Sequence, residues 1–206
     1  MPSSPATTTP VQDQEFDPLV FWIQHKSKIL LFTGLIVAAL LIYAASEYYS
    51  QKRNSNAQVA YANAKTLEDF RKIATDYSGT ITGGNAQLML ADKLRTDGKL
   101  DESSAALHTF IDKYPSHPLI SGAYTSLGAN LESQNKLDEA LTTYQKVSSA
   151  YANSFSTPVA LLAQARILAE KGKPDDARRV YEQIITQYQD NFASQVAGQE
   201  LRKLKK

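Results

Sequence analysis

The stretches GKLDE (residues 98–102), NKLDE (residues 135–139) and GKPDD (residues 172–176) begin 37 residues apart each time. The first residue is glycine or its usual substitute asparagine, which suits the left-handed backbone that ends a helix. The acidic residues that follow place negative charge in the first turn of the next helix, where free amide groups and the helix dipole favour it. Pro174 fits there too, because an early helical residue needs no amide partner. These stretches therefore predict the same turn between two helices, three times over.

The same interval recurs among apolar and aromatic residues. Within one period the spacing is helical, since Leu127 and Leu131 lie four residues apart, and Ala140, Tyr144 and Val147 follow at i, i+4 and i+7. Each unit is therefore predicted to be a pair of amphipathic helices. The sets spaced by 37 residues are Tyr77, Tyr114, Tyr151 and Tyr188; Ile73, Phe110, Val147 and Ile184; and Phe70, Leu107, Tyr144 and Tyr181.

These patterns resemble the tetratricopeptide repeat, a helix-turn-helix unit of about 34 residues. Three extra residues lie in each connection between repeats. Ser103 replaces the interhelical alanine of one repeat, and Gln164 stands at a leucine position of another, which weakens that contact. Small residues recur because paired helices approach closely. The positions that match the family pattern are Leu90, Ala91, Tyr124, Leu127, Gly128, Ala140, Tyr144, Ala165, Ala177 and Tyr181.

Residues 29–46, ILLFTGLIVAALLIYAAS, form an uncharged and almost entirely apolar run. As a helix this run spans roughly 26 Å, enough to cross a bilayer. A buried soluble helix is disfavoured because nothing else in the chain is apolar enough to enclose it. A cleaved signal peptide stays open as an alternative at Ala44-Ala45-Ser46, although the run is long and begins late for one. Interfacial aromatic residues flank it: Phe21, Trp22, Tyr43, Tyr48 and Tyr49.

The predicted fold is all-α, with a single N-terminal transmembrane helix, a tetratricopeptide-repeat α-solenoid of about four helical hairpins and a C-terminal capping helix. The expected parts are a disordered tail at 1–20, an anchor at 21–46 and a repeat domain at 47–206. The expected hairpins within that domain are 47–80, 84–117, 121–154 and 158–190, followed by a cap at 191–206.

Charges beside the apolar run predict its orientation. Lys26 and Lys28 precede the run directly, while Lys52 and Arg53 lie several residues after it. This weak bias favours a cytoplasmic N-terminus and an external repeat domain. The inverted topology stays open, because the leader before the run contains no base in its first 18 residues and would not resist translocation. A bacterial inner membrane, with the repeat domain in the periplasm, is the expected location.

Composition excludes several classes of function. The chain has 206 residues and a formal net charge of +1, so it lacks the basic surface of a general nucleic-acid binder. It has no cysteine, which excludes disulfides and thiolate chemistry. Its three histidines, at 25, 108 and 117, lack metal-ligand spacing, and ITGGN at 81–85 is interpreted as a turn before a helix rather than a phosphate loop. We expect no catalytic residue, metal or cofactor, and therefore no enzyme.

Binding is expected on the concave face that first helices line in this repeat. The face alternates charge with small apolar patches, which suits an extended or partly folded polypeptide. The 37-residue tyrosine series is interpreted as packing between repeats rather than as an RNA-stacking ladder. The predicted binding residues are Leu88, Asp92, Arg95, Thr125, Ala129, Glu132, Leu162, Arg166 and Glu170.

Residues 16–206 resemble the YfgM-like family of bacterial ancillary translocon subunits. The resemblance lies in the order of the parts and in short stretches such as VAYANAK (59–65), YSGT (77–80) and LADKL (90–94). The resemblance implies a periplasmic repeat domain held beside the protein-conducting channel, with translocon subunits, exported chains and periplasmic chaperones as partners. The alternative is an envelope scaffold that assists outer-membrane assembly or coordinates cell division. The oligomeric state is left open.

Overall fold

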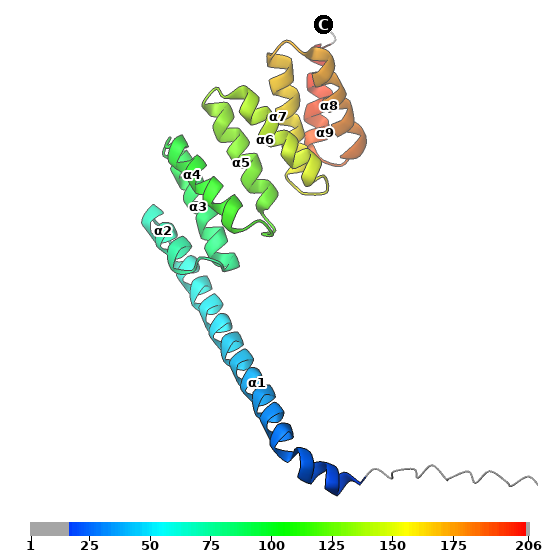
Figure 1. Cartoon of the computed structure of the whole chain (residues 1–206). Helices are drawn as coiled ribbons and strands as arrows, with labels where there is room; N and C mark the ends of the chain where they lie inside the picture. The colour runs from blue at the N-terminus through cyan, green and yellow to red at the C-terminus, as the bar shows by residue number, and fades with distance from the viewer. Residues whose placement is uncertain (1–16, 205–206) are drawn as a thin grey trace, which may run out of the picture. The chain divides into compact units, whose positions relative to one another are not determined.

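The computed structural model describes residues 17–204, and within them every regular element is an α-helix. The predicted all-α solenoid is confirmed (Figure 1). The expected tail at 1–20 lies mostly outside the described residues, but its last residues already belong to the first helix. The helices are α1 (Pro18–Asn63), α2 (Leu67–Asp76), α3 (Ile81–Thr96), α4 (Leu100–Lys113), α5 (Ile120–Ser133), α6 (Leu137–Ala150), α7 (Thr157–Glu170), α8 (Pro174–Gln187) and α9 (Phe192–Leu204).

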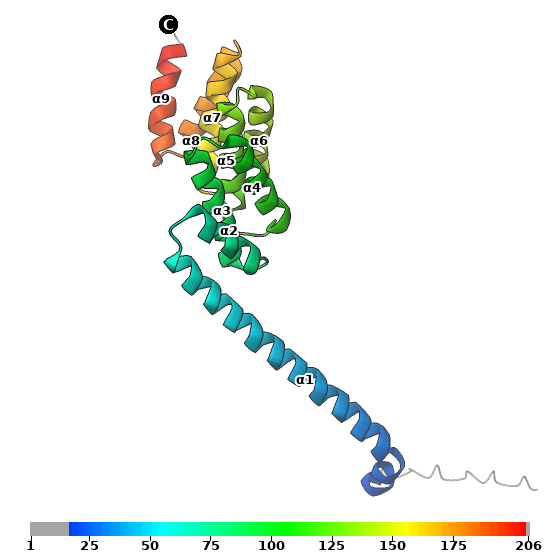
Figure 2. The same cartoon turned by 90° about the vertical axis from the view of Figure 1, so that its left-hand side faces the viewer.

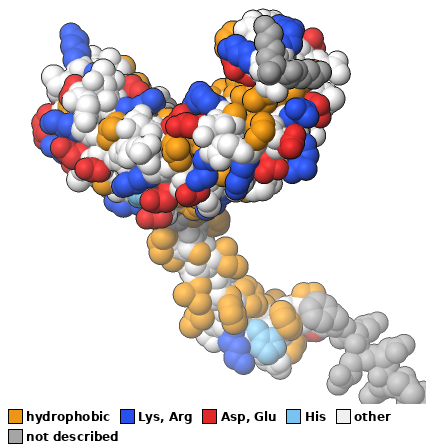
Figure 3. Space-filling view, turned by 90° about the horizontal axis from the view of Figure 1, so that it is seen from above, with side chains coloured by type: hydrophobic (Ala, Val, Ile, Leu, Met, Phe, Trp, Pro, Cys, Tyr) orange, Lys and Arg blue, Asp and Glu red, His pale blue; other side chains and the backbone are white. Residues whose placement is uncertain are grey.

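Two compact units make up the chain, and the boundary between them falls within α1 after Gln51. In the first unit the apolar run of α1 has none of its side chains buried, and Leu41 and Ile42 are 66% and 71% exposed. Hydrophobic side chains cover this helix in Figure 3. α1 is the one helix in the described part of the chain that is long and apolar enough to cross a membrane.

The second unit starts with the last turns of α1, which pack against α2. Ala57 is fully buried, and the rings of Tyr61 and Phe70 meet edge to face at 5.6 Å. Arg53 donates hydrogen bonds to the carbonyl oxygens of Asp76, the last residue of α2, and Ser78, at 3.1 and 2.9 Å. Residues 52–63 therefore serve as the first helix of a hairpin, continuous with the apolar helix.

The three repeated stretches form the same turn, as predicted. Gly98, Asn135 and Gly172 have positive φ angles of 75°, 59° and 71°. In each case the next residue, a lysine, donates its N–H to a leucine carbonyl five residues earlier, at 2.9 Å. This is the bond that closes a helix in the Schellman motif. The following helices then begin with two acidic residues in their first turns.

Helices α3 to α8 pack as successive hairpins, and α9 packs on α8 at the C-terminal end (Figure 2). The repeat-pattern residues form their core: all are buried except Tyr124, which is half-buried. Gly128 of α5 lies directly under the ring of Tyr144 of α6. A β-carbon at residue 128 would stand only 2.6 Å from that ring, which explains the glycine.

The glycine pair of ITGGN does not form a turn before a helix, and that prediction was wrong. Gly83 and Gly84 lie in the first turn of α3, where the Thr80 hydroxyl accepts the Gly83 N–H at 2.9 Å. A β-carbon at Gly83 would come within 2.2 Å of the Tyr77 carbonyl oxygen, and one at Gly84 within 3.0 Å of the His117 ring. Both glycines therefore permit a close approach between repeats.

Tyrosines at the ends of the second helices connect neighbouring repeats. The Tyr114 hydroxyl accepts the N–H of Gly79 at 3.1 Å, and the Tyr188 hydroxyl donates to the Ala152 carbonyl at 2.9 Å. Each tyrosine thus reaches back to the connection that ends the preceding repeat. The other two tyrosines of the series, Tyr77 and Tyr151, are partly buried and pack against the core of the repeats.

Polar residues at two interior positions are hydrogen-bonded rather than merely tolerated. Ser103 donates to the Ala91 carbonyl at 2.7 Å and accepts from the Asn130 amide nitrogen at 2.9 Å, which connects α3, α4 and α5. Gln164 donates to the Tyr144 carbonyl at 3.0 Å and to the Ser148 hydroxyl at 2.9 Å. The contact expected to be weakened at Gln164 is therefore replaced by two hydrogen bonds from α7 to α6.

Candidate functional site

A groove of about 500 Å³ lies between α3 and α5 and is the candidate functional site. Leu88 and Met89 come from α3, Leu119 immediately precedes α5, and Gly122 lies in the first turn of α5. Phe155, in the connection between α6 and α7, completes the apolar wall and is itself 68% exposed. Tyr61 of α1 and Ser103 and Leu107 of α4 also line the groove, which therefore joins residues from five segments of the chain.

The groove also contains two opposite charges on α3. Asp92 and Arg95 are both exposed, and neither forms an ion pair with any residue that the structure describes. They lie three residues apart, which corresponds to about 4.5 Å along a helix axis. Asn85 and Ser126 add uncharged polar groups to the lining. The groove thus has an apolar part and a polar part without net charge.

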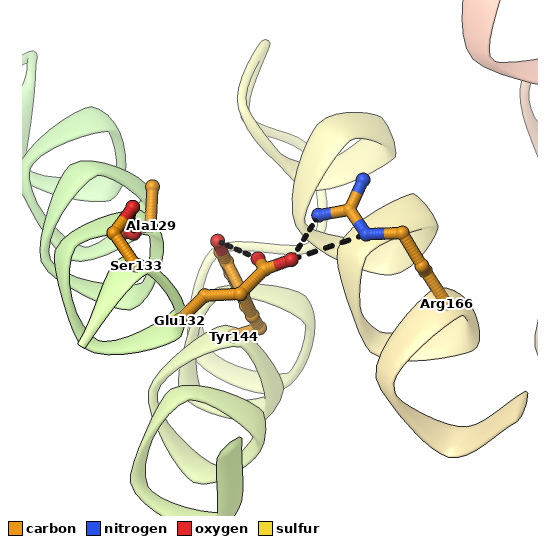
Figure 4. A network of polar contacts seen from close by, with 5 residues as sticks. All are labelled: Ala129, Glu132, Ser133, Tyr144 and Arg166. Atoms are coloured by element: carbon orange, nitrogen blue, oxygen red, sulfur yellow. Dashed lines mark hydrogen bonds and ion pairs between the residues drawn. The ribbon is translucent and has the colours of Figure 1, made fainter. Parts of the chain in front are cut away.

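The next interface, between α5 and α7, is closed by an ion pair instead (Figure 4). Glu132 of α5 accepts from Nη2 and Nε of Arg166 on α7, at 2.6 and 3.1 Å, through the same carboxylate oxygen. Its other oxygen accepts from the Tyr144 hydroxyl at 3.2 Å. Burial and the adjacent Glu132 carboxylate raise the pKa of Tyr144, so this hydroxyl stays a donor. Both oxygens of Glu132 are therefore engaged within the protein.

The 37-residue register explains why the two interfaces differ. Arg95 stands at the position of Glu132, and Ala129 stands at the position of Arg166. An ion pair across α3 and α5 would need an acid at 129, and alanine cannot supply one. Arg95 is consequently left unpaired at the interface where the groove lies, among the described residues.

The other four predicted binding residues lie in neither the groove nor the ion pair. Thr125 and Ala129 lie on α5 outside the groove lining, and the Thr125 hydroxyl is bonded to the Ser121 carbonyl at 2.9 Å. Leu162 packs against the core of the C-terminal repeats, and Glu170 is exposed at the last residue of α7. The predicted face therefore separates into a groove, an ion pair and a packing contact.

Sequence reasoning missed the second wall of the groove. Leu119, Gly122 and Phe155 are absent from the predicted set, because that set was projected from first-helix positions alone. One signal in the sequence was an apolar residue near the start of the first helix of each repeat. At positions 81, 118, 155 and 192, spaced by 37 residues, stand Ile81, Pro118, Phe155 and Phe192, and the isoleucine and both phenylalanines are exposed. Connections were interpreted only as turns.

The described residues contain no cluster of three side chains suited to hold a metal ion. Basic and acidic side chains are interspersed over the repeat domain in Figure 3, without a large block of one sign. The most distinctive feature of this surface is therefore the groove with its apolar wall.

Comparison with known proteins agrees with the helical repeat geometry. A family model described as a tetratricopeptide repeat-like domain matches residues 20–206. The chain belongs to this family. No curated protein matches the sequence. The repeat fold of the family is that of a protein–protein interaction scaffold, which is typically non-catalytic.

Solved structures support the fold in the same way. A putative kinesin light chain from Podosopora anserina, described as having nearly identical TPR-like repeats, is similar with a TM-score of 0.56 and 15% identity. The match covers 75% of this chain and 84% of that chain. A second structure of that protein gives a TM-score of 0.55 with the same coverage and identity. At this identity the likeness establishes the repeat fold alone.

Proposed function

We propose that this protein is a single-pass membrane protein whose repeat domain binds polypeptides outside the cytoplasm, as an ancillary subunit of a bacterial translocon. The observation that carries the proposal is the pairing, in one chain, of an apolar helix with no buried side chain in its span and a repeat domain with an open groove. An apolar helix that no protein surface covers is stable in a bilayer.

The orientation follows from the charges beside the span. Lys26 and Lys28 stand directly before the apolar run, whereas Glu47 follows it before any base. The positive-inside bias favours an N-terminus in the cytoplasm and a groove on the outer side. In that compartment the groove meets chains that have just crossed the membrane and have not yet folded, in company with periplasmic chaperones.

A second candidate is an envelope scaffold that docks on one folded partner, for outer-membrane assembly or cell division. One observation favours it. Ile81, Phe155 and Phe192 are 65%, 68% and 74% exposed and occupy the same position of the 37-residue register. Pro118 holds that position between Ile81 and Phe155, so the exposed apolar residues recur at three of four equivalent positions. Such a set suits a fixed complementary surface better than a variable chain.

Photocrosslinking in intact cells tests the proposal. A photoreactive amino acid replaces Ser126 in the groove, and a matched variant carries it in place of Ser149, which is exposed on α6 outside the groove. Crosslinks from residue 126 to translocon subunits and to many exported chains, with few from 149, are expected. One folded partner captured at both positions would favour the scaffold. Cytosolic proteins alone would refute the proposal.

A further inference from the structure

The groove between α3 and α5 has features that define the class of segment it accepts. We infer that it binds an extended polypeptide segment through one bulky apolar side chain and the uncharged backbone beside it, without requiring a charged residue. This inference rests on the proposed function and deepens it by naming what the groove recognises.

The apolar end of the groove fits one bulky side chain. Phe155 lies above Gly122, where a β-carbon would stand 3.5 Å from the ring edge, an ordinary contact distance. The next repeat has Val159 at the position of Gly122, so the glycine leaves space that its neighbour fills. Leu88 and Met89 form the opposite wall. Burial of a phenylalanine or leucine side chain there would favour binding, because apolar surface leaves water.

The polar end fits a peptide backbone rather than a charged side chain. Asp92 offers only acceptors and Arg95 only donors, and the two charges sum to zero. An N–H and a C=O of one extended segment can therefore meet Asp92 and Arg95 together. A free carboxylate would meet Arg95 but would be repelled by Asp92.

The groove can bind a ligand because no ion pair within the protein crosses it among the described residues. At the α5–α7 interface, Arg166 and Tyr144 occupy both oxygens of Glu132, so that interface has no unpaired charge to offer at this level. At the α3–α5 interface, Ala129 leaves Arg95 free among the described residues. Recognition is therefore confined to one interface of the solenoid.

Fluorescence anisotropy with full-length protein in lipid nanodiscs tests the inference. The probe is a short labelled Gly-Ser peptide with one central phenylalanine and an amidated C-terminus. Comparison probes replace the phenylalanine with serine, or carry a free C-terminal carboxylate. Gly122→Val fills the groove with the residue that the next repeat uses. Leu88→Thr removes the opposite wall, and Leu162→Thr is its matched control, 74 residues along in the same register.

The expected result is roughly tenfold weaker binding when the peptide loses its phenylalanine, and a similar loss in Gly122→Val and Leu88→Thr. Leu162→Thr should bind as the unmodified protein does, and the free carboxylate should add nothing. Equal binding of the phenylalanine and serine probes, dependence on the free carboxylate, or equal losses in Leu88→Thr and Leu162→Thr would overturn the inference. Exported chains crosslinked in cells alongside any of those results would leave the translocon role standing and place the client site elsewhere.

A charge variant gives an independent readout. Ala129→Glu supplies the acid that the register lacks, so Arg95 should pair across the groove and probe binding should fall several-fold. Ala129→Gln is the matched neutral control and should bind nearly normally. Raising the salt concentration should restore binding to Ala129→Glu in part, because exposed ion pairs are screened. A normal affinity in Ala129→Glu would contradict the role of Arg95.

Discussion

At the scale of single residues, two glycines of α5 differ in what surrounds them. A β-carbon at Gly128 would stand 2.6 Å from the buried Tyr144 ring, whereas one at Gly122 meets nothing closer than 3.5 Å. Gly128→Ala should therefore destabilise the repeat domain by about 1–3 kcal/mol through overpacking. Gly122→Ala should stabilise it by up to about 1 kcal/mol, because alanine favours the helix. Urea unfolding of the full chain measures both, and equal effects would contradict the packing.

The ion pair between Lys171 and Asp138 predicts a pH dependence. The hydrogen bond and charge of Lys171, 2.7 Å away, lower the pKa of Asp138. A carboxyl whose pKa is lowered by folding stabilises the protein above its unfolded pKa of about 3.9 and loses that effect as pH falls through its folded pKa. Asp138→Asn should therefore lower the melting temperature at pH 7, and the difference from the unmodified protein should vanish in acid.

A matched control exists one repeat earlier. Gln134 donates to Asp101 at 2.9 Å in the register of the Lys171 bond. Lys171→Gln should keep a hydrogen bond and leave the Asp138 charge in the first turn of α6, so its melting temperature should fall less than that of Asp138→Asn, which loses that charge. A constant difference between Asp138→Asn and the unmodified protein at every pH would contradict the assignment.

At the scale of helices, the hydrogen-bonded set around Asn130 couples α3, α4 and α5. Ser103→Ala introduces the residue type that the next repeat has at this position, but it removes the nearer acceptor of the fully buried Asn130 amide, at 2.9 Å, and leaves the Ser104 hydroxyl at 3.3 Å. It should cost about 1–3 kcal/mol. Asn130→Ile introduces the residue type that the next repeat has at this position, as Ile167. In that background Ser103→Ala should lower the free energy of unfolding far less. A double-mutant cycle in urea measures the coupling, and additive effects would refute it.

Sequence patterns predicted the helices well because each is bounded by local chemistry. The turn at Gly98 depends on residues within one helical turn, and its recurrence at Asn135 and Gly172 made the period visible. The groove was harder to predict because its walls come from α3, α5 and the Phe155 connection. The glycine pair Gly83-Gly84 was wrongly predicted to be a turn for the same reason. The Tyr77 carbonyl and the His117 ring, whose closeness requires glycine there, belong to other segments of the chain.

At the scale of the whole molecule, client binding and translocon association both require that a membrane span hold the repeat domain outside the cytoplasm. The chain has no cysteine, so single cysteines can report topology without background. Suitable sites are Ser4 before the span and Ser149, exposed on α6. If the span is uncleaved, both cysteines remain on one full-length, membrane-bound chain that resists alkaline carbonate extraction.

The decisive measurement is labelling of these two variants with a membrane-impermeant maleimide in intact spheroplasts and after lysis. We expect Ser149→Cys to be labelled in intact spheroplasts and Ser4→Cys to be labelled only after lysis. Labelling of Ser4→Cys alone before lysis would place the repeat domain in the cytoplasm and contradict the proposed function.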